Sequence, residues 1–228
     1  MPTPPASRLT RPSAAVALVA ALGVVALMIG ALASPPRVQA LMSEQGPFET
    51  VAAAGYFVAA LALLALRDAR QPLALWLALA IVMTAFGLRE LDLHKAWTEI
   101  SVLKSRFWIG AQPLTHKAAA LAVLAPVAWA LWWLARHRGA TLWRALRERH
   151  PVAVTAAVFL VTLVLTKAVD RGVNILSDDL GVAVSARARA LGLAFEEVLE
   201  MALALLVLLG LGQHRALARR TAAPPDAG

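Results

Sequence analysis

Long apolar runs separated by short polar segments make up almost the whole chain. A helix needs about 20 apolar residues to cross a hydrocarbon core about 30 Å thick. The runs that approach this length predict spans at residues 13–33, 49–66, 73–88, 118–134, 151–169 and 198–212. The pattern therefore predicts an all-α fold, a polytopic transmembrane bundle of six spans in a single domain, 13–212. The polar ends, 1–12 and 213–228, are expected to be tails, and the first is expected to be disordered.

The first apolar run has a second interpretation. Val38-Gln39-Ala40 resembles the small-residue site at which a signal peptide is cleaved. The apolar core of a signal peptide has about 7–15 residues. The run at 13–33 is longer, which favours a retained span, and in both interpretations residues 34–48 lie outside the membrane.

The distribution of basic residues predicts which side of the membrane each loop faces. Four segments hold twelve of the 22 Lys and Arg residues but only three of the 14 acids. With six spans they fall on one side, and they are the two tails, the turn at 67–72 and the loop at 135–150. Because Lys and Arg in short loops favour the cytoplasmic side, both ends of the chain are expected in the cytoplasm. The expected location is the inner membrane of a bacterium.

Composition agrees with this interpretation and narrows the function. Hydrophobic residues make up 60% of the chain and charged residues 16%, with a mean hydropathy of +0.67, whereas soluble domains average about 25% charged. The net charge of +8 is explained by the arginines that set the topology, so we expect membrane lipids and not nucleic acid as partners. The chain has no Cys, which excludes disulfides and thiolate sites.

Charged residues gather at the outer ends of several predicted spans. Glu49 opens the second span, and the third ends in Arg89-Glu90-Leu91-Asp92-Leu93-His94-Lys95. If that helix continues, Glu90 and His94 share one face, and Asp92 can pair with Lys95. A carboxylate and an imidazole on one face suit a divalent metal or a general base. The alternative is an interfacial helix end with solvated charges.

The fifth span ends in a row of polar residues at steps of four. This row comprises Thr162, Thr166, Asp170 and Asn174, and the adjacent row comprises Lys167 and Arg171. A polar row that reaches into an apolar span usually faces the bundle interior or water. Hydrogen bonding between helices explains the threonines equally well, but it does not explain the charged residues.

Three carboxylates, Glu196, Glu197 and Glu200, mark the entry of the sixth span. If the helix begins there, its dipole stabilises the first two. Glu200 lies a turn deeper and is followed by apolar residues, so it needs a positive partner. The candidates are Lys167, Arg171, Arg89 or a bound cation.

The connector at 98–117 alternates basic and apolar residues, as segments near lipid headgroups do. Lys104 is its candidate ligand for a phosphate, and a connector with snorkelling side chains is the alternative. Together, the polar ends of the spans predict one outward-facing site. Its candidate catalytic residues are Asp92, His94, Asp170 and Glu200, and a divalent metal would be held by Asp92, His94 and Glu200. Its candidate ligand-binding residues are Glu49, Glu90, Lys95, Lys104, Lys167, Arg171, Glu196 and Glu197.

Four motifs in these segments resemble a family of multi-pass bacterial inner-membrane proteins of unassigned activity. They are Arg89-Glu90-x-Asp92-x-His94-Lys95, Ser101-Val102-Leu103-Lys104, Lys167-x-x-Asp170-Arg171 and Glu196-Glu197-x-x-Glu200. The resemblance covers about 44–212 and implies a shared topology and polar face, but no reaction. The scattered acids and His also resemble alkaline ceramidases, which are intramembrane metal-dependent hydrolases. The chain departs from these by one span and by the absence of their paired His near the last span.

Three functions follow from these patterns. The leading hypothesis is a periplasmic-face site that binds a metal or a lipid headgroup and hydrolyses a lipid-linked substrate. The second is an accessory or assembly subunit whose polar faces contact a protein partner in the membrane. The third is a transporter of a small molecule or ion, which the absence of charge in the middle of the spans disfavours.

Overall fold

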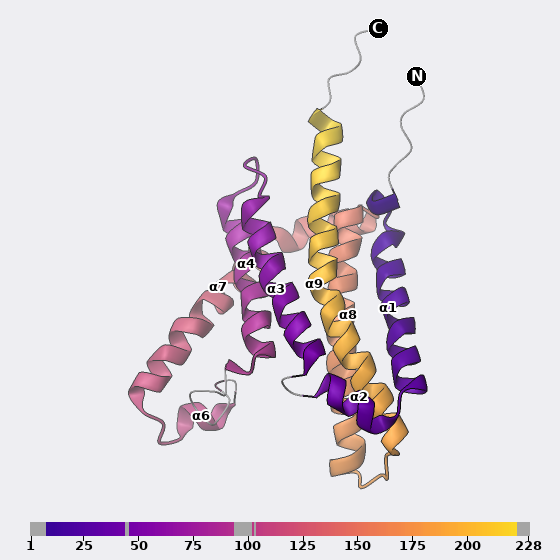
Figure 1. Cartoon of the computed structure of the whole chain (residues 1–228). Helices are drawn as coiled ribbons and strands as arrows, with labels where there is room; N and C mark the ends of the chain where they lie inside the picture. Colours follow the sequence, from indigo (N-terminus) through magenta and orange to yellow (C-terminus); the bar gives the residue numbers. More distant parts are fainter. Residues whose placement is uncertain (1–7, 44–45, 94–101, 103, 223–228) are drawn as a thin grey trace. The chain divides into compact units, whose positions relative to one another are not determined.

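The computed structural model describes residues 8–43, 46–93, 102 and 104–222, and all regular structure in these ranges is helical (Figure 1). This confirms the all-α prediction. The helices are α1 (Ser13–Leu32), α2 (Pro35–Met42), α3 (Pro47–Ala65), α4 (Leu73–Glu90), α6 (Ser105–Ile109), α7 (Leu114–Arg147), α8 (Pro151–Asn174) and α9 (Ala186–Ala222). Short 3-10 and π segments, η1 (Arg8–Thr10) and η2 (Ile175–Asp179), precede α1 and follow α8.

Within the described ranges, five helical segments are long and apolar enough to cross a membrane. They are Ser13–Leu32, Pro35–Ala65, Leu73–Glu90, Leu114–Arg147 and Pro151–Ser177. This finding indicates a multi-pass membrane protein. Helix α9, which contains the sixth predicted span, is not among the five, so the count of six spans and the orientation stay predictions.

Helices α8 and α1 bury small residues and expose large apolar ones. On α8 the buried residues are Ala153, Thr155, Thr162 and Thr166, and the exposed large ones include Leu160, Val161, Val164 and Leu165. Helix α1 repeats this pattern, with Ala15, Ala26 and Gly30 inside. Helices in lipid associate through small residues because large apolar side chains gain nothing by leaving the lipid. Water would strongly disfavour so large an apolar surface, so this pattern independently supports the membrane assignment.

Three helix ends differ from the sequence expectation. Helix α4 ends at Glu90 and does not continue to His94, because Asp92 adopts the left-handed backbone conformation, with φ of 50°, which does not belong to an α-helix. The 135–150 segment, expected as a loop, is helical up to Arg147. Helix α9 extends past residue 212 to Ala222. Arginine is a good helix former, so basic segments can prolong a helix beyond its apolar part.

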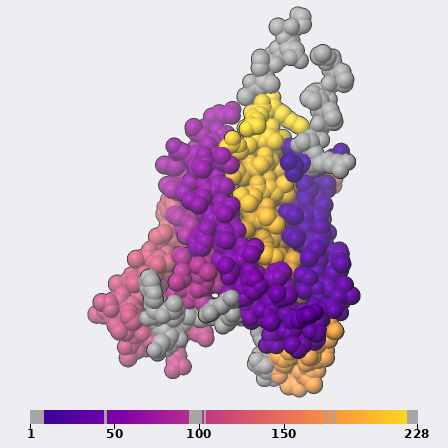
Figure 2. Space-filling model, viewed as in Figure 1, coloured from indigo at the N-terminus to yellow at the C-terminus, as the bar shows by residue number. Residues whose placement is uncertain are grey.

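The chain divides into two compact units, which we describe separately. The first unit comprises Met1–Phe48 and Leu142–Gly228, and the second comprises Glu49–Thr141. In the first unit, α9 packs against α8, α1 and α2. The space-filling view shows α1 and α9 side by side over most of the length of α1 (Figure 2). Helix α9 is therefore the central helix of this unit.

Glycines allow the helices of the first unit to approach closely. A Cβ atom at Gly30 of α1 would lie 2.8 Å from Leu191 Cδ2 and 3.0 Å from Leu191 Cα of α9, and one at Gly192 would lie 3.1 Å from Val173 Cγ2 of α8. Arg187 Nη1 donates hydrogen bonds to the carbonyl oxygens of Gly30, Ala31 and Ala33 at the end of α1. These contacts fix how α9 sits between its neighbours.

The second unit is joined by aromatic and polar contacts. Tyr56 of α3 stacks on Phe86 of α4, with ring centroids 5.4 Å apart. At the opposite end of α4, Trp76 Nε1 donates a hydrogen bond to the carbonyl oxygen of Asp68 in the turn that follows α3, over 3.2 Å. Arg138 Nη2 of α7 donates one to Gln71 Oε1 over 3.0 Å. The turn at 67–72 is therefore held by both helices.

Candidate functional site

A lysine bridges two carboxylates of the neighbouring helix in the first unit. Lys167 Nζ of α8 lies 2.5 Å from Glu200 Oε1 and 3.6 Å from Glu196 Oε1 of α9. The Glu200 side chain is 5% exposed, that of Glu196 17% and that of Lys167 31%. We call these three residues the charged centre. The pairing confirms that Glu200 has a cationic partner and selects Lys167 from the candidates.

The local sequence explains why these groups meet. Glu196 and Glu200 are four residues apart, so they project from one face of α9. Gly192, one turn before Glu196, removes a side chain where α9 meets Val173 of α8. On α8, Thr166 is fully buried next to Lys167, and its hydroxyl donates to the carbonyl oxygen of Leu163 over 2.9 Å. The Thr166 hydroxyl is therefore satisfied within α8.

The helix dipole does not compensate the carboxylates. Helix α9 begins at Ala186, so Glu196 lies in its third turn, and the effect of the dipole falls off within the first turn. Glu196 precedes the predicted span 198–212, and burial together with the charge of Asp170 raises its pKa to about 7, against the opposing effect of Lys167. Glu196 can therefore gain or lose a proton near neutral pH.

Three other predicted site residues surround the charged centre in sequence. Asp170 is half-buried on α8, and its charge acts on Glu196. Glu197 is half-buried on α9, and Arg171 is exposed on α8. The side chain of Asn174 lies outside the described residues. In this part of α8 and α9 the carboxylates, including Glu196 and Glu200, outnumber the bases.

The remaining predicted site residues belong to the second unit. Glu90 is buried at the last residue of α4, Asp92 is half-buried just beyond it, and Glu49 is half-buried in the first turn of α3. Lys104 is exposed before α6. Helix α4 ends at Glu90, so the continuous helix on which the shared face of Glu90 and His94 and the pairing of Asp92 with Lys95 depended does not extend beyond that residue.

His94 and Lys95 themselves lie outside the described residues. A single site that joins these residues to the charged centre stays a prediction.

The metal hypothesis also stays a prediction. Among the described residues, no three His, Asp or Glu side chains are grouped so that they could hold a metal ion. Of the three proposed ligands, His94 is outside those residues, Asp92 is in the second unit and Glu200 is in the first. The interaction that is described for Glu200 is with Lys167.

Sequence reasoning missed a second polar link in the first unit. Gln213 is fully buried; its Oε1 accepts a hydrogen bond from Thr155 over 2.7 Å, and its Nε2 donates one to the carbonyl oxygen of Leu9 over 3.0 Å. The sequence feature that indicates this link is Gln213 itself, a polar residue that directly follows the long apolar run and was expected to begin the tail. The amide connects η1, α8 and α9.

Fold and site together define a multi-pass helical membrane protein with a charged centre between two of its helices. The chain matches no protein-family model, no curated protein and no solved structure. The resemblance to inner-membrane proteins stays an expectation.

Proposed function

We propose that the chain is a bacterial inner-membrane protein with six spans and both ends in the cytoplasm, and that it binds the ammonium headgroup of a lipid or lipid-linked substrate at its periplasmic face. The observation that carries the proposal is the charged centre, in which Lys167 contacts Glu196 and the buried Glu200. An ionisable group inside a membrane bundle is costly, so it usually serves a function.

The charge balance favours a cationic ligand group. Four carboxylates, Asp170, Glu196, Glu197 and Glu200, occur in this part of α8 and α9, with two bases, Lys167 and Arg171. Negative charge in a medium of low dielectric attracts cations strongly. A primary ammonium resembles the lysine head group that already lies between two of the carboxylates.

Binding would proceed by exchange. The Lys167 side chain is partly exposed, whereas Glu200 is buried, so the lysine can move out while the carboxylates stay in place. The incoming ammonium would take the position of the lysine Nζ. Lys167 thus stabilises the empty site and competes with the ligand, which distinguishes it from an ordinary structural salt bridge.

The same residues could support hydrolysis of a lipid-linked substrate. A general base works best with a pKa near the operating pH, and the pKa of Glu196 is raised to about 7. With the ammonium held by Glu200, Glu196 would take a proton from a water molecule whose oxygen attacks the ester of the substrate. The ester bond to the alcohol would break, Glu196 would return the proton to the departing alcohol, and the displaced Lys167 would stabilise the negative charge that develops on the substrate. Hydrolysis is an extension of the binding proposal, and the binding experiments below do not depend on it.

Binding is tested with purified protein in detergent and two matched probes, lysophosphatidylethanolamine and lysophosphatidylglycerol. We expect Glu196→Gln combined with Glu200→Gln to abolish binding of the ethanolamine lipid and to leave binding of the glycerol lipid unchanged. Lys167→Met should bind the ethanolamine lipid more tightly than the original protein, because the competing cation is gone. Glu148→Gln, which changes an exposed acid near the end of α7, is the control. Unchanged binding of the ethanolamine lipid by the double Gln variant, or weaker binding of that lipid by Lys167→Met, would contradict the proposal.

The pH dependence gives an independent check. Protons compete with the ammonium for Glu196, so affinity should rise as the pH increases through about 7, the pKa of that carboxyl. Glu196→Gln should remove this rise. Metal analysis of the purified protein addresses the competing metal hypothesis, since a stoichiometric divalent ion lost in Glu200→Gln would replace the ammonium proposal with a metal site.

The topology is tested with cysteines, which the chain lacks. Single cysteines at residue 3 and residue 227 should react with a membrane-impermeant maleimide only after cells are opened. A cysteine at residue 183, between α8 and α9, should react in cells whose outer membrane has been made permeable. The reverse pattern at any of the three positions would refute the proposed orientation.

A further inference from the structure

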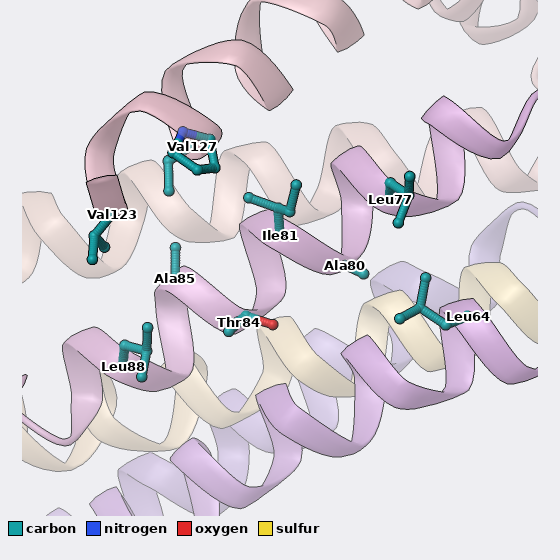
Figure 3. A pocket seen from close by; sticks show the side chains of 10 residues that line it. Leu64, Leu77, Ala80, Ile81, Thr84, Ala85, Leu88, Val123 and Val127 are labelled. Carbon is teal, nitrogen blue, oxygen red and sulfur yellow. The ribbon is translucent and has the colours of Figure 1, made fainter. Parts of the chain in front are cut away.

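An apolar groove in the second unit runs along α4. Its volume is about 300 Å³. The lining residues come from α3, α4 and α7 and are Leu64, Leu77, Ala80, Ile81, Thr84, Ala85, Leu88, Val123, Pro126 and Val127. Thr84 is the one residue with a polar side chain among them. Figure 3 shows Leu64 and Leu77 towards one end of the groove and Leu88 at the other.

The length of the groove matches one lipid leaflet. From Leu77 to Leu88 the helix rises about 16 Å, at about 1.5 Å per residue. Half of a hydrocarbon core about 30 Å thick is about 15 Å. The groove therefore has the length and the apolar lining that one acyl chain requires.

Arginines gather at the end of the groove next to Leu64 and Leu77. The turn that follows Leu64 in the sequence contains Arg67 and Arg70, both exposed. Arg138 of α7 is brought to the same turn by its hydrogen bond to Gln71. Its guanidinium also lies over the ring of Trp133, 6.0 Å from the centroid, so two contacts hold it in place.

The way α4 and α7 pack supports the position of the arginines at the end of the groove. In Figure 3, Val123 and Val127 of α7 lie across the groove from Ile81 and Ala85 of α4. Arg138 lies eleven residues beyond Val127, and Gln71 lies ten residues before Ile81. The hydrogen bond between Arg138 and Gln71 therefore joins the two helices about as far along α7 as along α4 from the groove. The groove and the arginines thus belong to one continuous surface of the second unit.

We infer that this surface binds an anionic phospholipid, with one acyl chain in the groove and the phosphate headgroup at Arg67, Arg70 and Arg138. Asp68 is the acid in this turn, and it pairs with Arg70 Nε over 3.2 Å, so the arginines leave an excess of positive charge. Anionic lipids of the cytoplasmic leaflet attract basic residues near the membrane surface. The inference uses the proposed orientation only to choose this leaflet and does not depend on the charged centre.

The experiment compares lipids that share acyl chains and differ in charge. Delipidated full-length protein in detergent is titrated with phosphatidylglycerol, with phosphatidylcholine and with glycerol phosphate, and binding is followed by native mass spectrometry. We expect phosphatidylglycerol to bind most tightly and glycerol phosphate, which lacks the acyl chains, to bind weakly. Equal affinity for phosphatidylcholine, or for glycerol phosphate alone, would overturn the inference.

Two sets of variants distinguish binding of the headgroup at the arginines from binding of the acyl chain in the groove. Arg67→Gln combined with Arg138→Gln should weaken phosphatidylglycerol binding about thirty-fold, from the attraction typical of two basic residues near an anionic surface. Arg220→Gln, at an exposed arginine near the end of α9, is the control and should bind normally. An equal loss in the control would show general electrostatic attraction and would overturn the specific site.

Val123→Phe fills the groove from α7, where the exposed Val123 tolerates a larger side chain. This substitution should weaken the binding of both phospholipids and leave the binding of glycerol phosphate unchanged. Val164→Phe, at an exposed position of α8, is the matched control. Unchanged phosphatidylglycerol binding by Val123→Phe would refute occupation of the groove by an acyl chain. The melting temperature of each variant confirms that it is folded before its affinity is compared.

Discussion

Replacing Lys167 with Met leaves the buried Glu200 without the cation that lies 2.5 Å away. Breaking a buried ion pair by removing one partner costs about 3–5 kcal/mol, whereas exposed pairs contribute about 0–1 kcal/mol. The Glu200 side chain is 5% exposed, and that of Lys167 is 31% exposed. Since water reaches the lysine, we place the cost for Lys167→Met at the lower end, about 3 kcal/mol.

A double-mutant cycle isolates the interaction itself. Glu200→Gln removes the charge but keeps a side chain of similar shape. The double variant, with both changes, lacks the buried Glu200 charge that Lys167→Met leaves in place, so it should be more stable than Lys167→Met alone. We expect a coupling energy of about 1–3 kcal/mol, within the range for residues in direct contact.

The free energy of unfolding is measured for all four proteins in mixed micelles, with loss of helical circular dichroism as the signal. The Asp68–Arg70 pair is the control, because its arginine is 65% exposed, and exposed pairs contribute little. A coupling energy for Lys167 and Glu200 below about 0.5 kcal/mol, or no larger than that of the control pair, would refute the view that the buried carboxylate depends on the lysine.

Four further substitutions test the packing of the first unit, each by its melting temperature. Gly30→Ala should destabilise the protein by about 1–3 kcal/mol, because the added carbon would meet Leu191. Gly212→Ala, where a Cβ meets no atom within 4 Å, should stabilise the protein slightly. The reverse order of the two melting temperatures would refute the close approach of α1 and α9. Gln213→Ala should cost about 1–3 kcal/mol, because it leaves the buried hydroxyl of Thr155 without its acceptor; no change would mean that the amide is not structurally important. Arg187→Ala should cost about 0.3–1 kcal/mol by uncapping α1, and should expose the end of α1 to protease; unchanged digestion would contradict the capping role.

The helical segments could be predicted from the sequence because they depend on local properties. The third span was expected at 73–88, and α4 runs from Leu73 to Glu90. A run of apolar residues specifies a helix in lipid by itself, since every backbone group is satisfied within the segment. The ends were less predictable, because one backbone rotation at Asp92 ends α4, and no hydropathy pattern records such a rotation.

In the charged centre, the sequence around Glu200 was enough to predict that this carboxylate needs a positive partner, but it was not enough to predict which residue that partner is. The burial of Glu200 follows from the apolar residues after it, and the cost of burying a carboxylate requires a positive charge nearby. Lys167, Arg171 and Arg89 all satisfied that requirement in the sequence. The packing of α8 against α9 decided for Lys167, because the distance between side chains on different helices depends on the register of those helices.

The buried link at Gln213 likewise has one part that the sequence determined and one part that only the tertiary structure decided. The sequence alone determined that a polar residue follows a long apolar run, which fits both a tail and a buried contact. Only the tertiary structure brought Thr155 and the carbonyl of Leu9 to it. Hydropathy is a property of single residues and their neighbours in sequence, whereas a hydrogen bond between helices requires two surfaces to meet, and that is decided when the helices pack.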